Sequence, residues 1–380
     1  MIINNLKAHG YKNLDGVDIA LDPKMNIICG ENAQGKTNLI EAVWLCSGCR
    51  SFRGTRDKDF IGFDKDSASV EMKFTDSVRT QEICFSVKKG ALKDKLVTLN
   101  GVKLPLLSKL FGSFRCVVFT PEDLNLTKGS PDNRRSFTDL SIAQIKPSYI
   151  SALNKYNTVL SHRNALLKNF EVDVKGEVRG TNAVWDQFDI WNTQLAESGA
   201  YISVLRNTFC AVLNSKVRGL YNSITDGRED LELRYQSTVY EDLTGETDFK
   251  GRLAEEYRRK LEESLEADKR AGFTTVGVHR DDLGAYIDGL PIREFGSQGQ
   301  ARSAALSMKL AHAQIIRDEY GEYPVMLLDD VLSELDPTRQ RFILNNIDDM
   351  QVIITCCDSR TVTDLKKGKV FTLKKGKVLK

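Results

Sequence analysis

The stretch CGENAQGKTN, residues 29–38, decides the fold. Gly30 and the triplet at 35–37 fit the pattern G-x-x-x-x-G-K-[ST], in which backbone amides at a helix N-terminus hold phosphate groups. The lysine of this pattern bridges the phosphates, and the hydroxyl of its last residue ligates magnesium. Apolar residues at 25–29 precede the stretch and a one-sided apolar pattern follows Lys36, so we predict a strand, a phosphate loop and a helix.

The acidic partner that a phosphate loop requires occurs far along the chain. An apolar run at 325–328 leads directly to Asp329 and Asp330. At the tip of a buried strand in an open α/β sheet, such carboxylates lie beside the phosphate loop. We therefore expect Asp329 to hold magnesium and Asp330 to orient the attacking water, with a cap on the following helix as the alternative for both.

A second stretch suited to anions, SQGQ at 297–300, opens an expected helix over 300–319. Backbone amides and a serine hydroxyl at a helix N-terminus attract negative charge. A helix cap without a ligand explains this stretch equally well when it is taken alone. In combination with the phosphate loop and the carboxylates, it suggests that two chains facing head to tail close two nucleotides between them.

The strand and helix signals divide the chain into two lobes. From about residue 130 to 272, glycine thins out and long segments carry helical spacing with mixed charges. We predict a helical lobe over 126–275, inserted into a lobe made of 1–125 and 276–380. The expected strands lie at 17–21, 70–74, 83–87, 115–120, 274–278 and 352–355, with tight hairpin turns at Asn100-Gly101, at Asp288-Gly289 and around 374–376.

The bulk composition is that of a globular chain. Of its 380 residues, 41% are hydrophobic and 28% charged, and the formal net charge is +2. No apolar run long enough to span a membrane and no secretory signal is visible, so we expect a cytoplasmic protein with no membrane contact. The eight cysteines lack the spacing of a disulfide or zinc framework, and we interpret Cys46-Ser47-Gly48-Cys49 as part of the core or a helix end.

Because the charge is nearly balanced, a nucleic-acid surface requires local clusters of basic residues. For each cluster, a solvated face or a guarded sheet edge is the alternative interpretation. The candidates are Arg50, Arg53 and Arg56 around Phe52, then Arg134 and Arg135, and finally Lys366, Lys367, Lys369, Lys374, Lys375 and Lys377. We interpret residues 279–282, HRDD, as an internal polar network that supports the SQGQ region rather than as a catalytic group.

The order of these motifs resembles that of ABC-type ATPases, and the whole chain resembles the RecF family of bacterial recombinational repair proteins. The phosphate loop, SQGQ, the aspartate strand and SELD at 333–336 follow one another in the family's order. Further similar stretches are YKNL at 11–14, FTPEDLNLTKGSPDNRRSF at 119–137, GVHRDDL at 277–283 and LLDDVLSELD at 327–336. The resemblance implies an α/β fold of the ABC-type ATPase head: a mixed sheet around a phosphate-loop core, antiparallel strands and an inserted helical subdomain.

The same resemblance implies ATP and Mg²⁺ as cofactors and assigns the site residues. Lys36 and Asp330 are the implied catalytic residues, and Thr37 and Asp329 are the implied metal ligands. The implied triphosphate ligands are Gly30, Glu31, Asn32, Ala33, Gln34, Gly35, Lys36, Thr37 and Asn38, with Lys12 and Asn13 near the nucleotide. Ser297, Gln298, Gly299 and Gln300 would contact the γ-phosphate held by a second copy, and the SELD stretch would communicate across the dimer.

The family's activity implies a DNA-binding ATPase switch. ATP would close a homodimer on double-stranded DNA near single-strand gaps, and slow, DNA-stimulated hydrolysis would release it. RecR and RecO are the implied partners, and loading of RecA is the implied outcome.

Several positions depart from the broader ABC pattern and indicate slow turnover. Asp330 replaces the usual glutamate and reaches less far, and Thr355 stands at a position often held by histidine. Ala301 replaces an amide residue, and TPED at 120–123 stands where a magnesium-sensing glutamine is usual. The alternatives are a small-molecule kinase, which gives no reason for SQGQ, an ABC-type ATPase subunit of another system, and a scaffold with vestigial hydrolysis.

Overall fold

The chain forms two compact units. The computed structural model describes residues 1–48, 51–52, 57–90, 95–168, 171–172, 178–179, 182–357 and 368–379. The first unit comprises Met1–Leu124, Lys216–Asp230 and Ser297–Lys380, and the second comprises Asn125–Ser215 and Leu231–Gly296. Residues 276–296 therefore belong to the second unit, whereas our domain hypothesis had placed them in the divided lobe.

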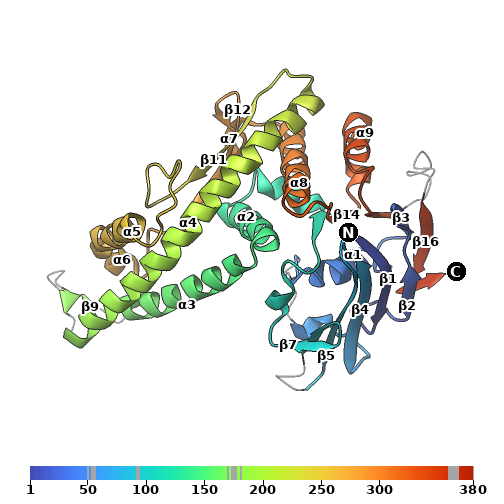
Figure 1. Ribbon diagram of the computed structural model, residues 1–380, viewed down its shortest axis with the longest axis horizontal. Helices are drawn as coiled ribbons and strands as arrows, with labels where there is room; N and C mark the ends of the chain where they lie inside the picture. The colour runs from blue at the N-terminus through green and yellow to red at the C-terminus, as the bar shows by residue number, and fades with distance from the viewer. Residues whose placement is uncertain are drawn as a thin grey trace. The chain divides into compact units, whose positions relative to one another are not determined.

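A largely parallel sheet forms the centre of the first unit (Figure 1). Its strand order is β17-β16-β3-β15-β14-β8, and only the β16–β17 pair is antiparallel. Nearly all residues of the four central strands are buried, as expected for a parallel sheet covered on both faces. The strands are β3 (Met25–Cys29), β8 (Cys116–Phe119), β14 (Val325–Asp329), β15 (Val352–Cys356), β16 (Lys369–Lys374) and β17 (Lys377–Leu379).

Helices cover this sheet. Helix α1 (Lys36–Leu45) begins directly after the glycine loop and packs against β14 and β15. Helix α8 (Gln298–Tyr320) packs against β8 and contacts α9 (Pro337–Asn346). The predicted strand, loop and helix around residues 25–45 are confirmed.

The second sheet of the first unit is antiparallel, in the order β2-β1-β4-β5-β6-β7. Its hairpin turn at Asn100-Gly101 has the positive φ angles of 52° and 78° that a two-residue primed turn requires. The predicted antiparallel pair and this hairpin are therefore confirmed. The strands are β1 (Ile2–His9), β2 (Val17–Ala20), β4 (Ser67–Thr75), β5 (Thr80–Lys88), β6 (Leu96–Leu99) and β7 (Val102–Leu104).

The second unit is mainly helical, as predicted, but it also contains strands. A three-stranded antiparallel sheet has the order β11-β12-β13 (Figure 1). Its β12–β13 turn is the predicted Asp288-Gly289 hairpin, whereas β11 was not predicted. The elements are α2 (Pro131–Ile145), α3 (Ser148–Lys168), β9 (Glu171–Val172), β10 (Val178–Arg179), α4 (Asn182–Thr225, whose last ten residues belong to the first unit), β11 (Leu231–Gln236), α5 (Arg252–Glu263), α6 (Leu265–Ala271), β12 (Asp282–Ile287), β13 (Leu290–Pro291) and α7 (Ile292–Phe295).

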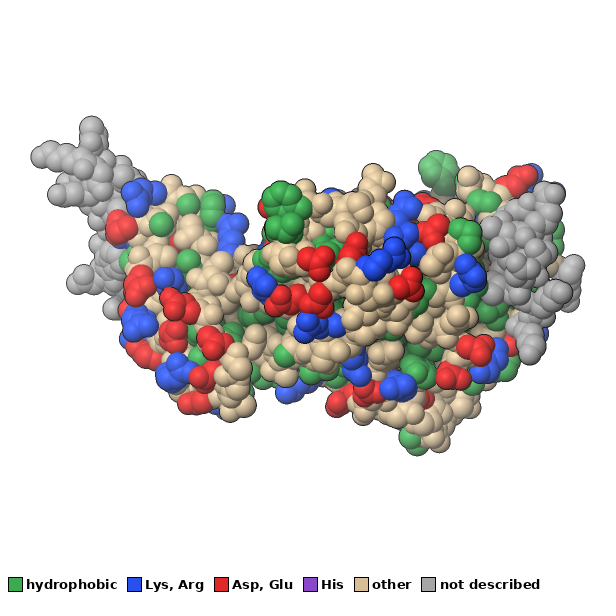
Figure 2. All heavy atoms as spheres, turned by 90° about the horizontal axis from the view of Figure 1, so that it is seen from above, with side chains coloured by type: hydrophobic (Ala, Val, Ile, Leu, Met, Phe, Trp, Pro, Cys, Tyr) green, Lys and Arg blue, Asp and Glu red, His purple; other side chains and the backbone are tan. Residues whose placement is uncertain are grey.

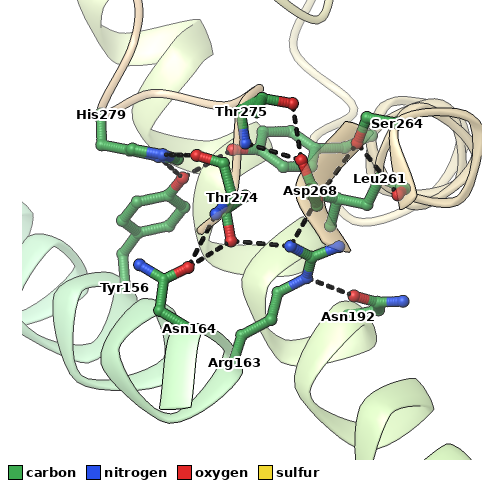
Figure 3. Close-up of polar contacts among 11 residues, drawn as sticks. Tyr156, Arg163, Asn164, Asn192, Leu261, Ser264, Asp268, Thr274, Thr275 and His279 are labelled. Atoms are coloured by element: carbon green, nitrogen blue, oxygen red, sulfur yellow. Dashed lines mark hydrogen bonds and ion pairs between the residues drawn. The ribbon is translucent and has the colours of Figure 1, made fainter. Parts of the chain in front are cut away.

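The strand predicted at 274–278 is wrong. This segment is irregular because side chains, rather than a neighbouring strand, bind its polar groups (Figure 3). Asn164 Oδ1 accepts the Thr274 amide at 2.8 Å, and Asp268 Oδ1 accepts the Thr275 amide at 2.8 Å. The strand signal was produced by β-branched residues that instead pack within this polar network, and the strand begins later, at Asp282.

A buried ion pair lies at the centre of the same network (Figure 3). Arg163 and Asp268 have fully buried side chains, and Arg163 Nη1 donates to Asp268 Oδ2 at 2.7 Å. His279 contacts the Tyr156 hydroxyl through Nδ1 at 2.8 Å and the Thr274 carbonyl through Nε2 at 3.0 Å. Residue 279 is thus part of an internal polar network, as predicted. The support that we expected this network to provide for SQGQ remains a prediction.

No helix in the described part of the chain is both long and apolar enough to cross a membrane.

Candidate functional site

The ends of three parallel strands bring the predicted loop and carboxylates together. Strands β14 and β15 are paired so that Asp329 lies opposite Thr355, and β15 and β3 are paired so that Cys356 lies opposite Cys29. The phosphate loop starts at the next residue, Gly30, and parallel strands end at one edge of a sheet. Pairing of the strands therefore places the early and late motifs side by side.

The loop at 30–37 has the backbone geometry of an anion cradle. Ala33 and Gly35 have positive φ angles of 64° and 108°, and successive amides in such conformations converge on one point. Lys36 is buried, and its Nζ donates to the carbonyl oxygens of Gly30 at 2.7 Å and Glu31 at 3.3 Å. The lysine cation is thus held over the loop, where it can meet a phosphate.

Asp329 sits between two hydroxyl groups. Thr37 Oγ1 donates to Asp329 Oδ1 at 3.1 Å, and Thr355 Oγ1 donates to the same oxygen at 2.8 Å. Burial raises the pKa of Asp329, while the hydrogen bonds from Thr355 and Thr37 act in the opposite direction. Hydroxyl and carboxylate oxygens are the ligands that Mg²⁺ prefers, and a divalent cation would offset the cost of burying this carboxylate. Thr37 and Asp329 therefore fit a magnesium site.

Thr355 has a structural role that the sequence did not reveal. Its side-chain oxygen also accepts the backbone amide of Asp330 at 2.9 Å, so one hydroxyl links the two acidic residues. Asp330 has a φ of 56°, an uncommon conformation for a residue other than glycine. Sequence analysis had interpreted Thr355 only as the loss of a histidine. The parallel pairing with β14 is the information that it lacked.

Cys357 was also missed, although it touches both predicted catalytic residues. Lys36 Nζ lies 3.3 Å from its sulfur, and the Asp330 carboxylate oxygens lie at 3.6 and 3.9 Å. The thiol contacts Asn32 Oδ1 at 3.1 Å as well. Its position just beyond the end of a buried strand was the only signal in the sequence that could have identified it.

Residues 12 and 13 lie next to the loop but differ in what they bind. Asn13 Nδ2 donates to the Ala33 carbonyl at 3.0 Å, and Asn38 Nδ2 donates to Asn13 Oδ1 at 2.7 Å. Lys12 forms an ion pair with the fully buried Glu41. The structure therefore shows Asn13 as a support of the phosphate loop. Contacts of either residue with a nucleotide remain predictions.

SQGQ forms the N-terminal cap of α8. Ser297 Oγ accepts the Gln300 amide at 3.1 Å, and Gln300 Oε1 accepts the Ser297 amide at 2.7 Å, which together make a capping box. Within the described residues, no hydrogen bond involves the amides of Gln298 and Gly299. The plain cap and the anion site that we weighed as alternatives are therefore compatible, because the capping box leaves two amides for an anion.

The SELD stretch connects the acidic strand to α8. Ser333 Oγ donates to the Asp330 carbonyl at 2.6 Å, and Arg302 Nη1 donates to the Glu334 carbonyl at 2.6 Å. Arg339 Nη2 donates to the Gly299 carbonyl at 3.0 Å and its guanidinium also pairs with Asp336. This chain of contacts gives a physical route between residue 330 and the SQGQ cap.

The TPED stretch contributes an ion pair. Lys309 Nζ binds Asp123 Oδ1 at 2.7 Å and the Val118 carbonyl at 2.6 Å. Burial raises the pKa of the Asp123 carboxyl, and the lysine opposes this effect. Among the described residues, no group of three or more His, Cys, Asp or Glu side chains forms a further metal site.

The predicted DNA-binding clusters have different fates. Arg134 is buried in a bidentate ion pair with Asp282, and Arg135 donates to the Asp281 carbonyl at 2.6 Å, so this pair does not form a free basic surface. Arg50, Arg53, Arg56, Lys366 and Lys367 lie outside the described residues. The exposed candidates are Lys369, Lys374, Lys375 and Lys377. Figure 2 shows acidic and basic side chains interspersed over the face that it displays, in agreement with the small net charge.

Comparison with known proteins covers the full length of the chain. The family described as RecF/RecN/SMC N terminal domain matches residues 2–379. The DNA replication and repair protein RecF of Alkaliphilus oremlandii is 36% identical over 383 residues, which cover 100% of both chains. A solved structure of the recombination mediator protein RecF-ATP in the RecFOR pathway is similar with a TM-score of 0.87 and 34% identity, covering 100% of this chain and 97% of that one. The Smc head domain of Pyrococcus furiosus has a TM-score of 0.54 at 15% identity over 100% of this chain and 96% of that one, a likeness of fold alone.

Proposed function

The chain belongs to the RecF/RecN/SMC N-terminal domain family, and from this premise we propose that it is an ATP-driven, DNA-binding switch of replication and recombinational repair. The predicted fold class, an ABC-type ATPase head with an inserted helical subdomain, is confirmed. The observation that carries the proposal is the contact of Thr37 and Thr355 with Asp329 beside the buried Lys36.

Nucleotide binding in this proposal uses the loop and the strand ends. The amides of the 30–37 loop would hold the β-phosphate, and Lys36 would exchange the Gly30 and Glu31 carbonyls for phosphate oxygens. Thr37 and Asp329 would hold Mg²⁺, which supplies charge neutralisation at the terminal phosphates. Each of these groups already lies within hydrogen-bond distance of a neighbour in the loop or strand, so little rearrangement is needed.

Hydrolysis in the proposal is slow for two reasons. Asp330 would orient the attacking water, but its side chain is one methylene shorter than the glutamate common in ABC-type ATPases. Thr355, in the place where a histidine is common, is neutral and engaged with Asp329 and Asp330. Both features favour a long-lived ATP-bound state over rapid turnover.

Dimerisation in the proposal depends on the SQGQ cap of a second copy. The amides of Gln298 and Gly299 and the positive end of the α8 dipole suit the γ-phosphate of a nucleotide held by the partner. The SELD contacts with Asp330 and with α8 would couple closure of the dimer to hydrolysis. ATP would therefore act as the bond between two head-to-tail copies.

The partners follow from the family. We propose that the closed dimer holds double-stranded DNA near single-strand gaps in the cytoplasm and acts with RecO and RecR in loading RecA. A relative's structure is described as a recombination mediator in the RecFOR pathway, which supports this assignment. Among the exposed candidates, the lysines of β16 and β17 are available to neutralise DNA phosphates.

Light scattering with and without Mg-ATP tests the proposal. We expect a monomer without nucleotide and a dimer with ATP. Ser297→Arg should retain ATP binding by the monomer but abolish the dimer, because the bulky cation blocks the approach of the second copy. ATP hydrolysis measured with and without duplex DNA, across a salt series, tests the DNA part, since phosphate contacts weaken with salt. A chain that binds ATP but stays monomeric under all these conditions would contradict the switch.

A further inference from the structure

We propose that the β16–β17 hairpin is a positioning element of the nucleotide site, anchored to the phosphate loop through Gln34 and Gly376. This inference rests on the proposed function, because it concerns how the same loop is kept ready for phosphate. It assigns Gln34, predicted as a nucleotide ligand, a different role for its side chain. It also gives a role in the site to a turn that nearly three hundred and forty residues separate from the loop.

The contacts between the hairpin turn and the loop are specific. The amide of Lys375 donates to Gln34 Oε1 at 2.5 Å, and the amide of Gly376 donates to the Gln34 carbonyl at 3.1 Å. The two hydrogen bonds thus hold both the side chain and the backbone of one loop residue. Gln34 directly precedes Gly35, whose φ of 108° is the most extreme in the loop, so the anchor acts where the loop conformation is least favourable.

The loop is held from a second side by residues that the same turn also contacts. Asn13 Nδ2 donates to the Ala33 carbonyl at 3.0 Å, and the Asp15 amide donates to the Gly376 carbonyl at 3.0 Å. The hairpin, the segment at 13–15 and the phosphate loop therefore form one closed ring of contacts. Preorganised amides bind an anion more tightly because the free protein has already paid the entropy of ordering them.

Gly376 is the residue on which this ring depends. A Cβ atom at this position would lie 1.7 Å from the Asn13 carbonyl oxygen, so any side chain forces the turn and the loop apart. The φ of Gly376 is 73°, which by itself also disfavours other residues. The chain supplies a matched control for this second effect: Gly101 has a φ of 78° in the same position of another hairpin, and a Cβ atom there meets nothing within 4 Å.

The first experiment compares Gly376→Ala with Gly101→Ala in the full-length chain. Both variants carry the same backbone strain, but only Gly376→Ala breaks the contacts with the loop. We expect Gly376→Ala to weaken the affinity for Mg-ATP about tenfold, the factor that the loss of one or two hydrogen bonds produces. Gly101→Ala should stay within about twofold of wild type. Equal affinities for the two variants would overturn the inference.

The second experiment separates an anchor from a ligand. Gln34→Met removes the acceptor of the Lys375 amide at similar side-chain length. If Gln34 acts through the hairpin, the double variant with Gly376→Ala should bind Mg-ATP about as weakly as Gly376→Ala alone. If Gln34 contacts the nucleotide directly, the two losses multiply, and the inference fails.

Hydrogen exchange without nucleotide makes the outcome independent of the proposed function. The amides at 31–38 should exchange faster in Gly376→Ala than in Gly101→Ala, while those of α8 stay unchanged. Wild-type protection at 31–38 in Gly376→Ala overturns the anchor whatever the protein binds. Wild-type protein that does not bind Mg-ATP, with exchange changed as expected, contradicts the proposed function and leaves the anchor supported.

Discussion

Replacement of Thr355 by valine is the most direct test of how the two acidic residues are held. The substitution keeps the shape of the side chain but removes the hydroxyl that donates to Asp329 at 2.8 Å and accepts the Asp330 amide at 2.9 Å. A hydrogen bond to a charged group contributes about 1.5–3 kcal/mol, and an unsatisfied buried amide costs about 1–3 kcal/mol. Because Thr355 is fully buried, water does not replace the lost partners. We expect the free energy of unfolding to fall by about 3 kcal/mol.

The same substitution should slow hydrolysis more than it weakens binding. Loss of the Thr355 hydroxyl raises the pKa of Asp329 further, since this hydrogen bond is one of the effects that opposes burial. It also frees the strained backbone of Asp330, so the carboxylate that orients water loses its position. We expect kcat for ATP to fall at least about tenfold with a smaller change in nucleotide affinity.

Steady-state ATP hydrolysis, equilibrium nucleotide binding and urea denaturation measure these effects. Thr355→Ser keeps the hydroxyl and should recover most of the activity. Thr138→Val is the matched control, because Thr138 is also buried but its hydroxyl donates to the Arg134 carbonyl within α2, in the second unit. Wild-type hydrolysis by Thr355→Val, or no recovery by Thr355→Ser, would refute the reasoning.

Three further substitutions test separate parts of the structure. Lys36→Arg should reduce the rate of ATP hydrolysis more than ATP affinity, measured by single-turnover kinetics and equilibrium binding, because the larger guanidinium keeps the charge but not the position of Nζ over the loop. Burial lowers the pKa of His279 to about 4, so the unfolded chain takes up its proton first as the pH falls. Stability that is complete above about pH 6.5 should therefore decrease by about 3 kcal/mol towards pH 4, and urea denaturation of His279→Gln should show a smaller decrease over this range. Arg163→Met leaves Asp268 buried without its cation and should cost about 3–5 kcal/mol in urea denaturation, whereas Arg218→Met, whose partner is half exposed, should cost less than about 1 kcal/mol. Similar losses for these two arginine variants would contradict the role of burial.

Local chemistry explains the parts of the fold that were predictable. The phosphate loop follows from glycines and a lysine at fixed spacing, and the hairpin at Asn100-Gly101 follows from residues that tolerate positive φ. The wrong strand at 274–278 has a different cause. Its β-branched residues have strand propensity, but side chains of α3 and α6 bind its amides, and tertiary contacts override propensity.

The sequence by itself determined the phosphate loop, the acidic strand and the cap at Ser297, because each depends on residues that are neighbours in the chain. Only the tertiary structure decided that Thr355 links the two acids, and that the turn at Gly376 closes on Asn13 and Gln34. These contacts join residues far apart in sequence, and strand order and register create them. A residue's own pattern carries no information about which distant strand will lie beside it, because packing of the whole sheet selects that neighbour.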